Sequence, residues 1–298
     1  MMRRRHFITQ TGLASVVAGV AAGQSRNKKS WPIVIFEKPI QTLDYDRMGE
    51  ELSKMGVQGI EATIRRGGHI EAKDAGSEVP RMVKSLAKNG QKALIATCNV
   101  NLANEENANF LRILKANGIT RYRMDYFRYD LKKALLPQVA ENTAKLREIE
   151  AMNREIGMQA LYQIHAGAKY AGSLAWDAAM MFEKVNPDHA AIAFDLRHVK
   201  AGSGLSFPTA LAAMGKHVRS IFVKDARWGG ERTTSIKNVP LDTGIVNKKT
   251  FDEVRKGHGA MPLSLHMEWG KAPIYPKEIV MDAVAHVGRD VKVLKSWL

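Results

Sequence analysis

The chain has 298 residues, of which 45% are hydrophobic and 25% are charged. This composition is that of a folded globular protein and excludes a wholly disordered chain. The single cysteine, Cys98, excludes an intrachain disulfide framework, a Cys-based zinc finger and an iron–sulfur cluster. The length suits either one α/β barrel or two small domains.

The formal net charge of +15 is distributed unevenly along the chain. Residues 1–29 contain six basic residues and no acidic residue, which leaves +9 on the remainder. A body with that charge attracts anions in general, and basicity is the only feature that favours nucleic acid. A nucleic-acid-processing barrel is therefore a hypothesis that charge alone supports, and we expect no nucleic-acid partner.

The first 23 residues have the layout of an export signal. A basic segment precedes a short apolar run, residues 13–22, which ends in small residues and is too short to span a bilayer. The pair Arg4–Arg5 resembles that of a twin-arginine signal, for which a Sec signal or an uncleaved anchor is the alternative. We expect residues 1–23 to direct export to the periplasm and residues 24–30 to form a linker. No stable membrane insertion is expected after cleavage.

From residue 31 onward, short runs rich in β-branched and aromatic residues alternate with amphipathic segments. In one such segment Met48, Leu52 and Met55 share a helical face, and Gly56 suits the C-cap. The predicted strands are residues 32–36, 59–64, 92–97, 121–126, 158–164, 190–195, 218–224 and 262–267. Eight strand–helix units predict one (β/α)8 TIM barrel over residues 31–298.

A doubly wound open sheet is the main alternative architecture. That fold usually places a glycine-rich phosphate-binding turn after its first strand, whereas residues 36–40 here read Phe-Glu-Lys-Pro-Ile. A dinucleotide site at this turn is therefore not expected. The longest irregular stretch, residues 226–248, follows the seventh predicted strand, and we expect a long surface loop over one end of the barrel.

Polar side chains stand at or just after the carboxyl ends of the predicted strands, where parallel barrels carry their chemistry. Asp195 ends the sixth strand, Lys224 ends the seventh, and Glu268 follows the eighth. The other candidates at this rim are Arg65, His69, Gln163, His165, His198, Trp228 and Trp269. Convergence of so many polar groups is typical of a pocket for a polar small molecule.

Several of these strand ends together resemble the xylose isomerase-like TIM barrel superfamily, and within it the sugar phosphate isomerase/epimerase group. The similar segments are Gly59-Ile60-Glu61, Gln163-Ile164-His165, residues 194–198, Val223-Lys224-Asp225, residues 239–246 and the final Glu268. The resemblance covers essentially all of residues 31–298. It implies a TIM barrel that acts on a small carbohydrate.

The resemblance also implies a divalent-metal site made of a Glu, an Asp, a His and a Glu on strands five to eight. Asp195 and Glu268 match two of these positions, but Gln163 stands at the first Glu position and Phe222 at the His position. A Gln can offer its carbonyl oxygen to a hard cation, whereas a Phe offers no ligand. We therefore expect a weakened site for Mn²⁺, Mg²⁺ or Zn²⁺ on Asp195, Glu268 and Gln163, unless a histidine at the rim compensates. A metal-free variant is the alternative.

The predicted catalytic groups are Glu268, Lys224 and His198. Glu268 is expected to act as the general base, with its pKa raised by apolar walls. Lys224 or His198 would stabilise the developing enediolate. For each of them the alternative is a structural role, in a salt bridge or in a cap of a loop.

The predicted substrate contacts are of three kinds. Arg65 and His69 would hold an anionic group, because an arginine fork matches a carboxylate or phosphate. Trp228 and Trp269 would stack on a sugar ring. His165 would contact the substrate or assist with the enediolate. The alternatives are a solvated basic loop, loop packing and local backbone hydrogen bonding.

Together these residues predict an exported enzyme that abstracts a proton next to the carbonyl of a sugar or keto-sugar. The outcome would be isomerisation, epimerisation or β-elimination. Export favours a neutral sugar, keto-sugar or sugar acid over a sugar phosphate. The alternatives are a non-catalytic sugar-binding barrel and a metal-free lyase- or hydrolase-like variant of the same fold.

Overall fold

Eight parallel strands close into a barrel in the computed structural model, which describes residues 31–231 and 235–298. The order around the barrel is β1-β10-β7-β6-β5-β4-β3-β2. The strands are β1 (Ile33–Phe36), β2 (Gly59–Thr63), β3 (Lys92–Thr97), β4 (Arg121–Arg123), β5 (Gln159–Gln163), β6 (Ala190–Asp195), β7 (Val218–Val223) and β10 (Leu263–Leu265). The predicted TIM barrel is confirmed, and each of its strands lies within a predicted run.

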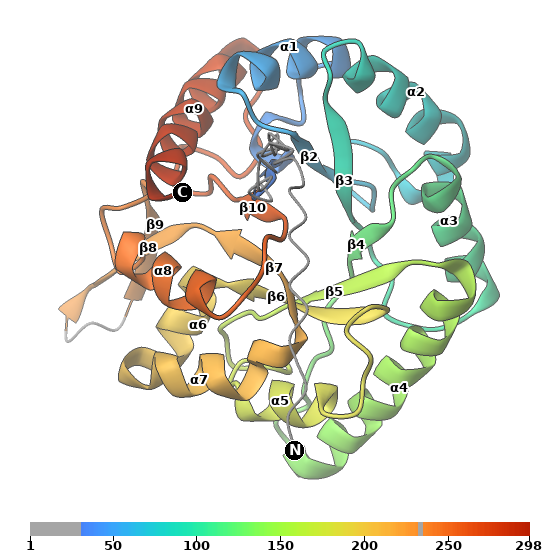
Figure 1. The fold of residues 1–298 in the computed structure, drawn as a ribbon, viewed down its shortest axis with the longest axis vertical. Helices are drawn as coiled ribbons and strands as arrows, with labels where there is room; N and C mark the ends of the chain where they lie inside the picture. The colour runs from blue at the N-terminus through green and yellow to red at the C-terminus, as the bar shows by residue number, and fades with distance from the viewer. Residues whose placement is uncertain (1–30, 232–234) are drawn as a thin grey trace, which may run out of the picture. The chain divides into compact units, whose positions relative to one another are not determined.

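Helices surround the barrel on its outside (Figure 1). They are α1 (Tyr45–Met55), α2 (Ala75–Ala87), α3 (Glu105–Ala116), α4 (Leu135–Ile156), α5 (Trp176–Phe182), α6 (Leu196–Ser203), α7 (Phe207–Met214), α8 (Lys248–Lys256) and α9 (Val280–Trp297). Short 3-10 turns cover Lys38–Ile40, Ala72–Asp74, Gly204–Ser206, Gly215–His217 and Lys277–Ile279. Helix α1 shows why these segments fold locally: Asp44 caps its first turn, Met48 and Leu52 are buried, and Gly56 ends it in the left-handed conformation.

Alternation along the strands divides the core into an outer and an inner layer. On β6, Ala190, Ile192 and Phe194 pack against the helices, whereas Ala191 and Ala193 face the barrel interior. The interior layer consists of Val34, Ile95, Leu161, Ala191, Ala193 and Phe222, with Leu94 packed against it. This apolar layer fills the barrel below its carboxyl end.

The same alternation places polar residues above that apolar layer. The residue two positions after Leu161 is Gln163, and Phe222 is followed in the same way by Lys224. Asp195 stands two positions after Ala193. Because residues i and i+2 of a strand share a face, these three side chains continue the inner face into the rim of the barrel.

The prediction of one long surface loop over residues 226–248 is wrong. This stretch contains most of a two-stranded antiparallel hairpin, β8 (Asp225–Gly229) and β9 (Ser235–Val239). The carboxylate of Asp225 accepts hydrogen bonds from four backbone N–H groups, those of Ala226, Thr243, Gly244 and Val246. A single buried carboxylate therefore organises the segment that the glycines and polar residues had suggested to be irregular.

The predicted export signal, residues 1–23, and the predicted linker, residues 24–30, lie outside the described residues. Within residues 31–231 and 235–298, no helix is both long enough and apolar enough to cross a bilayer.

Gly59 provides a test of the barrel register. It begins β2 with φ at +150°, and a Cβ there would lie 1.8 Å from the carbonyl oxygen of Lys92 on β3. We expect Gly59→Ala to lower the free energy of unfolding by more than about 2 kcal/mol, because backbone must move to admit the methyl group. Gly76→Ala is the control, since open space surrounds that exposed position in α2. It should leave stability unchanged or raise it by up to about 1 kcal/mol. Equal urea midpoints for the two variants would contradict this register.

Candidate active site

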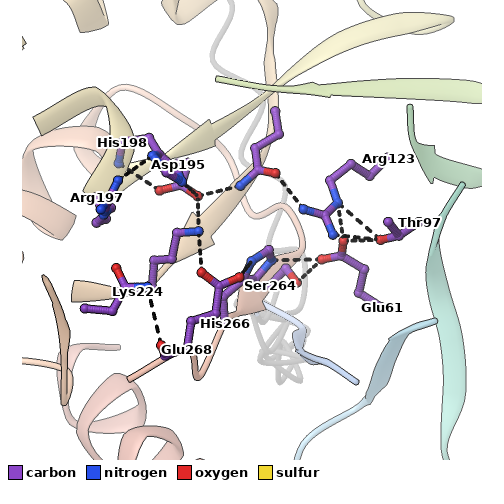
Figure 2. Close-up of polar contacts among 12 residues, drawn as sticks. Glu61, Thr97, Arg123, Asp195, Arg197, His198, Lys224, Ser264, His266 and Glu268 are labelled. Atoms are coloured by element: carbon purple, nitrogen blue, oxygen red, sulfur yellow. Dashed lines mark hydrogen bonds and ion pairs between the residues drawn. The ribbon is translucent and has the colours of Figure 1, made fainter. Parts of the chain in front are cut away.

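Seven side chains form a closed ring of polar contacts inside the carboxyl end of the barrel, the polar ring (Figure 2). In order, its members are Glu61, Arg123, Gln163, Asp195, Lys224, Glu268 and His266. They come from β2, β4, β5 and β6 and from the segments that follow β7 and β10. Residues more than 200 positions apart in the sequence are thus in contact.

One half of the polar ring is a buried ion pair. The guanidinium Nε of Arg123 lies 2.7 Å from Oε1 of Glu61, and both side chains are buried. Glu61 also accepts hydrogen bonds from the hydroxyls of Thr97 and Ser264, and His266 Nε2 lies 3.0 Å from its Oε2. Burial by itself would raise the pKa of Glu61, but Arg123 and His266 outweigh burial and hold this pKa at about 2.

Gln163 joins the two halves of the polar ring, and its amide has a defined orientation. Its Oε1 accepts hydrogen bonds from Arg123 Nη1 at 2.6 Å and from the Tyr126 hydroxyl at 2.5 Å. Its Nε2 donates to Asp195 Oδ2 at 2.7 Å. Because a guanidinium can only donate, the amide oxygen must face Arg123 and the amide nitrogen must face Asp195.

The other half of the polar ring centres on the Lys224 ammonium. Its Nζ lies 2.9 Å from Glu268 Oε2 and 3.5 Å from Asp195 Oδ2. The Lys224 side chain is 5% exposed and that of Asp195 is fully buried, but that of Glu268 is 29% exposed. Glu268 is thus the carboxylate of the polar ring that an incoming molecule can reach.

The prediction that apolar walls raise the pKa of Glu268 is wrong. Burial does act in that direction, but Lys224 and His266 outweigh it and hold this pKa well below its usual range. Burial likewise favours a higher pKa for Asp195, and Lys224 and His198 hold it below its usual range. Both carboxyl groups are therefore ionised at neutral pH.

His198 lies behind Asp195. Its backbone N–H donates to Asp195 Oδ1 at 2.9 Å, and its Nδ1 lies 2.7 Å from Arg197 Nη1. The side chain is only 4% exposed, and burial lowers its pKa well below the usual range. This position does not favour the predicted catalytic role, because a buried imidazole behind Asp195 supports that carboxylate and does not face an incoming molecule.

His165 packs against His198, with ring centroids 3.7 Å apart, and against Tyr170 at 4.2 Å. Burial is the main cause that lowers its pKa to about 4, and the positive charge of Lys224 contributes. His165 is therefore neutral at pH 7 and can offer a ring nitrogen to a polar ligand.

The two predicted anion-binding residues differ in their surroundings. The Nδ1 of His69 lies 3.3 Å from Oε2 of the buried Glu37, and its ring stacks on Tyr45 at 4.0 Å. Arg65 is half-buried and forms no ion pair with any acidic residue of the described chain. Burial lowers the pKa of Arg65, and the neighbouring Arg123 lowers it further.

The polar ring includes neither of the two predicted tryptophans. The indole of Trp269 donates to Asp290 of α9 at 2.7 Å and packs on His286 with centroids 4.3 Å apart, and its contact with a sugar stays a prediction. Trp228 stands on the β8 strand of the hairpin and is 42% exposed. Its contact with a sugar stays a prediction.

Arg123, Thr97 and Ser264 belong to the site, although none of them is among the site residues predicted from the sequence. The predicted fourth strand runs to residue 126, which places Arg123 in the interior of a strand, whereas β4 ends at Arg123. An arginine on a strand that is buried on both faces needs a buried partner of opposite charge. This feature of the sequence could have identified Arg123.

The polar ring does not fit a divalent cation. The amide oxygen of Gln163 is occupied by two donors, and Phe222 packs on the ring of His266 at 4.7 Å without offering a ligand atom. Between the two remaining acidic positions lies the ammonium of Lys224. Among the described residues, no group of three or more His, Cys, Asp and Glu side chains is arranged to hold a metal ion. The prediction of Gln163 as a metal ligand does not fit this geometry.

The fold, but not the sequence, connects this chain to known proteins. No protein-family model matches the sequence, and no curated protein matches it. The solved structures that resemble it include xylose isomerase-like TIM barrel proteins, which have the predicted fold. A xylose isomerase domain protein from Planctomyces limnophilus superposes with a TM-score of 0.63 at 14% identity, over 83% of this chain and 91% of that one.

Two further structures have the same fold. A xylose isomerase-like TIM barrel protein from Mycobacterium smegmatis, in complex with magnesium, has a TM-score of 0.64 at 14% identity, over 90% of this chain and 98% of that one. The 3-keto-D-glucoside 4-epimerase YcjR from E. coli has a TM-score of 0.61 at 12% identity, over 87% and 98%. At such low identity the similarity establishes the fold alone.

The buried ion pair of the polar ring provides a test of the site. Glu61→Gln keeps the shape of the side chain but leaves Arg123 buried without its carboxylate, so the free energy of unfolding should fall by about 3–5 kcal/mol. The control is Glu50→Gln, which removes an exposed carboxylate paired with Arg47 and should cost less than about 1 kcal/mol. Urea unfolding measures both. A small loss for Glu61→Gln would show that the pair is not closed as described.

Proposed function

We propose that this protein is an exported enzyme that removes a proton next to a carbonyl group of a sugar, a keto-sugar or a sugar acid. The observation that supports this most directly is the pair formed by Glu268 and Lys224, a reachable carboxylate beside a buried ammonium at the carboxyl rim of a TIM barrel. The shared fold with an epimerase that acts on a 3-keto-D-glucoside is consistent with this chemistry.

Glu268 acts as the base. Its carboxylate is ionised at neutral pH and takes a proton from the carbon next to the carbonyl, and the electron pair of the broken C–H bond moves into the carbonyl group. The negative charge that develops on the carbonyl oxygen is stabilised by the Lys224 ammonium, which donates a hydrogen bond to it.

The ion pair between these two residues links the two events. In the free protein Lys224 donates to Glu268 and makes that carboxylate a weak base. As charge builds on the substrate oxygen, Lys224 turns toward it and its hold on Glu268 weakens. The basicity of Glu268 then rises while it receives the proton, so the interaction is strongest in the transition state.

The fate of the proton decides the product. Its return to the former carbonyl carbon, while the proton of the adjacent hydroxyl passes to the former carbonyl oxygen, gives an isomer. Delivery of a proton to the opposite face of the original carbon gives an epimer, and loss of a leaving group from the carbon beyond it gives an elimination. His165 is neutral and packs beside His198, so it can hydrogen-bond a substrate hydroxyl without adding charge.

Two half-buried cations favour a sugar acid within this substrate class. Lys38 and Arg65 follow the neighbouring strands β1 and β2, and neither forms an ion pair with an acidic residue of the described chain. Burial lowers the pKa of Lys38 against the opposing influence of Glu268, and Arg65 and Lys224 lower it further. A carboxylate on the substrate would relieve this accumulation of positive charge.

Export is supported by residues 1–23 alone, with their basic segment, the Arg4–Arg5 pair and a short apolar run. A periplasmic enzyme meets unphosphorylated sugars and sugar acids. This is the reason to prefer them to sugar phosphates.

The test that separates an enzyme from a sugar-binding barrel is deuterium exchange. In heavy water, an enzyme of this kind exchanges the hydrogen next to the carbonyl of its keto-sugar, which proton NMR detects even without a net product. Glu268→Gln should slow this exchange by about 10²–10⁴-fold while ligand binding persists. Glu253→Gln, an exposed carboxylate on α8, is the control and should change neither. Binding with no exchange in the wild type, over a panel of keto-sugars and keto-sugar acids, would indicate a sugar-binding protein.

Substitution of two adjacent arginines, Arg65 and Arg66, tests the preference for a sugar acid. Arg65→Gln should weaken the binding of D-gluconate, used as a carboxylate probe, by about ten-fold or more, because a charge-assisted hydrogen bond is lost. The affinity for D-glucose should stay the same. The exposed Arg66 carries the same charge, so Arg66→Gln should leave both affinities unchanged. Calorimetry at constant ionic strength measures the affinities of both variants for both ligands. Equal effects of the two substitutions on gluconate binding would contradict a specific contact of Arg65.

A further inference from the structure

We propose that the ammonium of Lys224 occupies the place of a divalent cation in this barrel, so that the site excludes such a metal ion. The resemblance of the sequence to the xylose isomerase-like superfamily implies a cation held by residues that include the strand-six Asp and the strand-eight Glu. In this structure those two residues, Asp195 and Glu268, instead flank Lys224 Nζ at 3.5 Å and 2.9 Å (Figure 2).

The position of the lysine follows from the strand that precedes it. Phe222 faces the barrel interior, and Lys224, two positions further on, continues the same face at the rim. The side chain is 5% exposed, so its stem is enclosed and its charged end is directed at the two carboxylates. Lys224 therefore belongs to the site and is not a solvent-exposed surface lysine.

The remaining donor atoms are also engaged. The oxygen of Gln163 accepts from Arg123 and Tyr126, and its amide nitrogen faces Asp195. A metal ion at Asp195 would therefore meet N–H groups where it needs lone pairs, because neither an amide NH₂ nor an ammonium can act as a ligand.

The charge of the polar ring gives the second reason. Three carboxylates, on Glu61, Asp195 and Glu268, already lie against two basic side chains, those of Arg123 and Lys224. A divalent cation would add two positive charges beside a buried ammonium. In a buried site that repulsion is strong, because little water screens it.

The chemical consequence rests on the proposed function. A divalent metal polarises a carbonyl as a Lewis acid, whereas an ammonium stabilises the same oxygen by charge and by hydrogen bonding. Lys224 delivers both through a covalently attached group. The site is then complete at any metal concentration, and a chelator does not affect its activity.

The test measures Mn²⁺ binding by electron paramagnetic resonance, on the full-length protein and without substrate. The wild type should bind no Mn²⁺ at millimolar concentration. Lys224→Met frees the two carboxylates, and Lys224→Met with Gln163→Glu adds a third, so this double variant should bind Mn²⁺ at least ten-fold more tightly than the wild type. Lys73→Met removes an exposed lysine and should behave as the wild type.

Two results of this experiment would overturn the proposal. Tight stoichiometric Mn²⁺ binding by the wild type overturns the proposal, whatever the variants do. Failure of the double variant to bind Mn²⁺, when circular dichroism shows it folded, also overturns it, because the ammonium would then not be what excludes the cation. Lys224→Gln with Gln163→Glu replaces the double variant should that one not fold. Because no turnover is measured, the result is independent of whether a keto-sugar is converted.

Discussion

The pairing of buried charges at the carboxyl end of the barrel is the constraint on which the rest of this site depends. Asp195 and Glu61 are fully buried, and Arg123 and Lys224 nearly so. A buried charge is tolerated only when an opposite charge and hydrogen bonds compensate its lost hydration. Each member of the polar ring is therefore held in place by its two neighbours. Glu268, partly exposed, is the acidic member that keeps contact with the outside.

Much of the fold was readable from the sequence because periodic patterns report on local structure. The run 190–195 was predicted with its observed bounds, and α1 ends at Gly56 as expected. The hairpin over 225–239 was missed because its order comes from Asp225, which accepts backbone hydrogen bonds from residues up to 21 positions away. No local pattern reveals an anchor of that kind.

The sequence predicts which polar residues stand at the strand ends of the site, but it does not predict which of them contact one another. Position alone placed Asp195, Lys224 and Glu268 at the same rim. The low pKa of Glu268 required knowing that Lys224 and His266 are its neighbours. Trp269 shows the same dependence on remote partners, since its place after Glu268 does not reveal that its indole donates to Asp290 of α9. Direction of a side chain, unlike its place along a strand, depends on partners that are remote in sequence.

Lys224 and Asp225 are consecutive residues whose side chains are directed to different parts of the protein. One directs its ammonium into the polar ring, and the other directs its carboxylate to the backbone that closes the β8–β9 hairpin. The peptide bond between them therefore links the polar ring directly to the β8–β9 hairpin. The backbone that carries the ammonium into the site is thus the same backbone that Asp225 anchors to the hairpin, so the placement of Lys224 depends on a carboxylate that lies outside the polar ring.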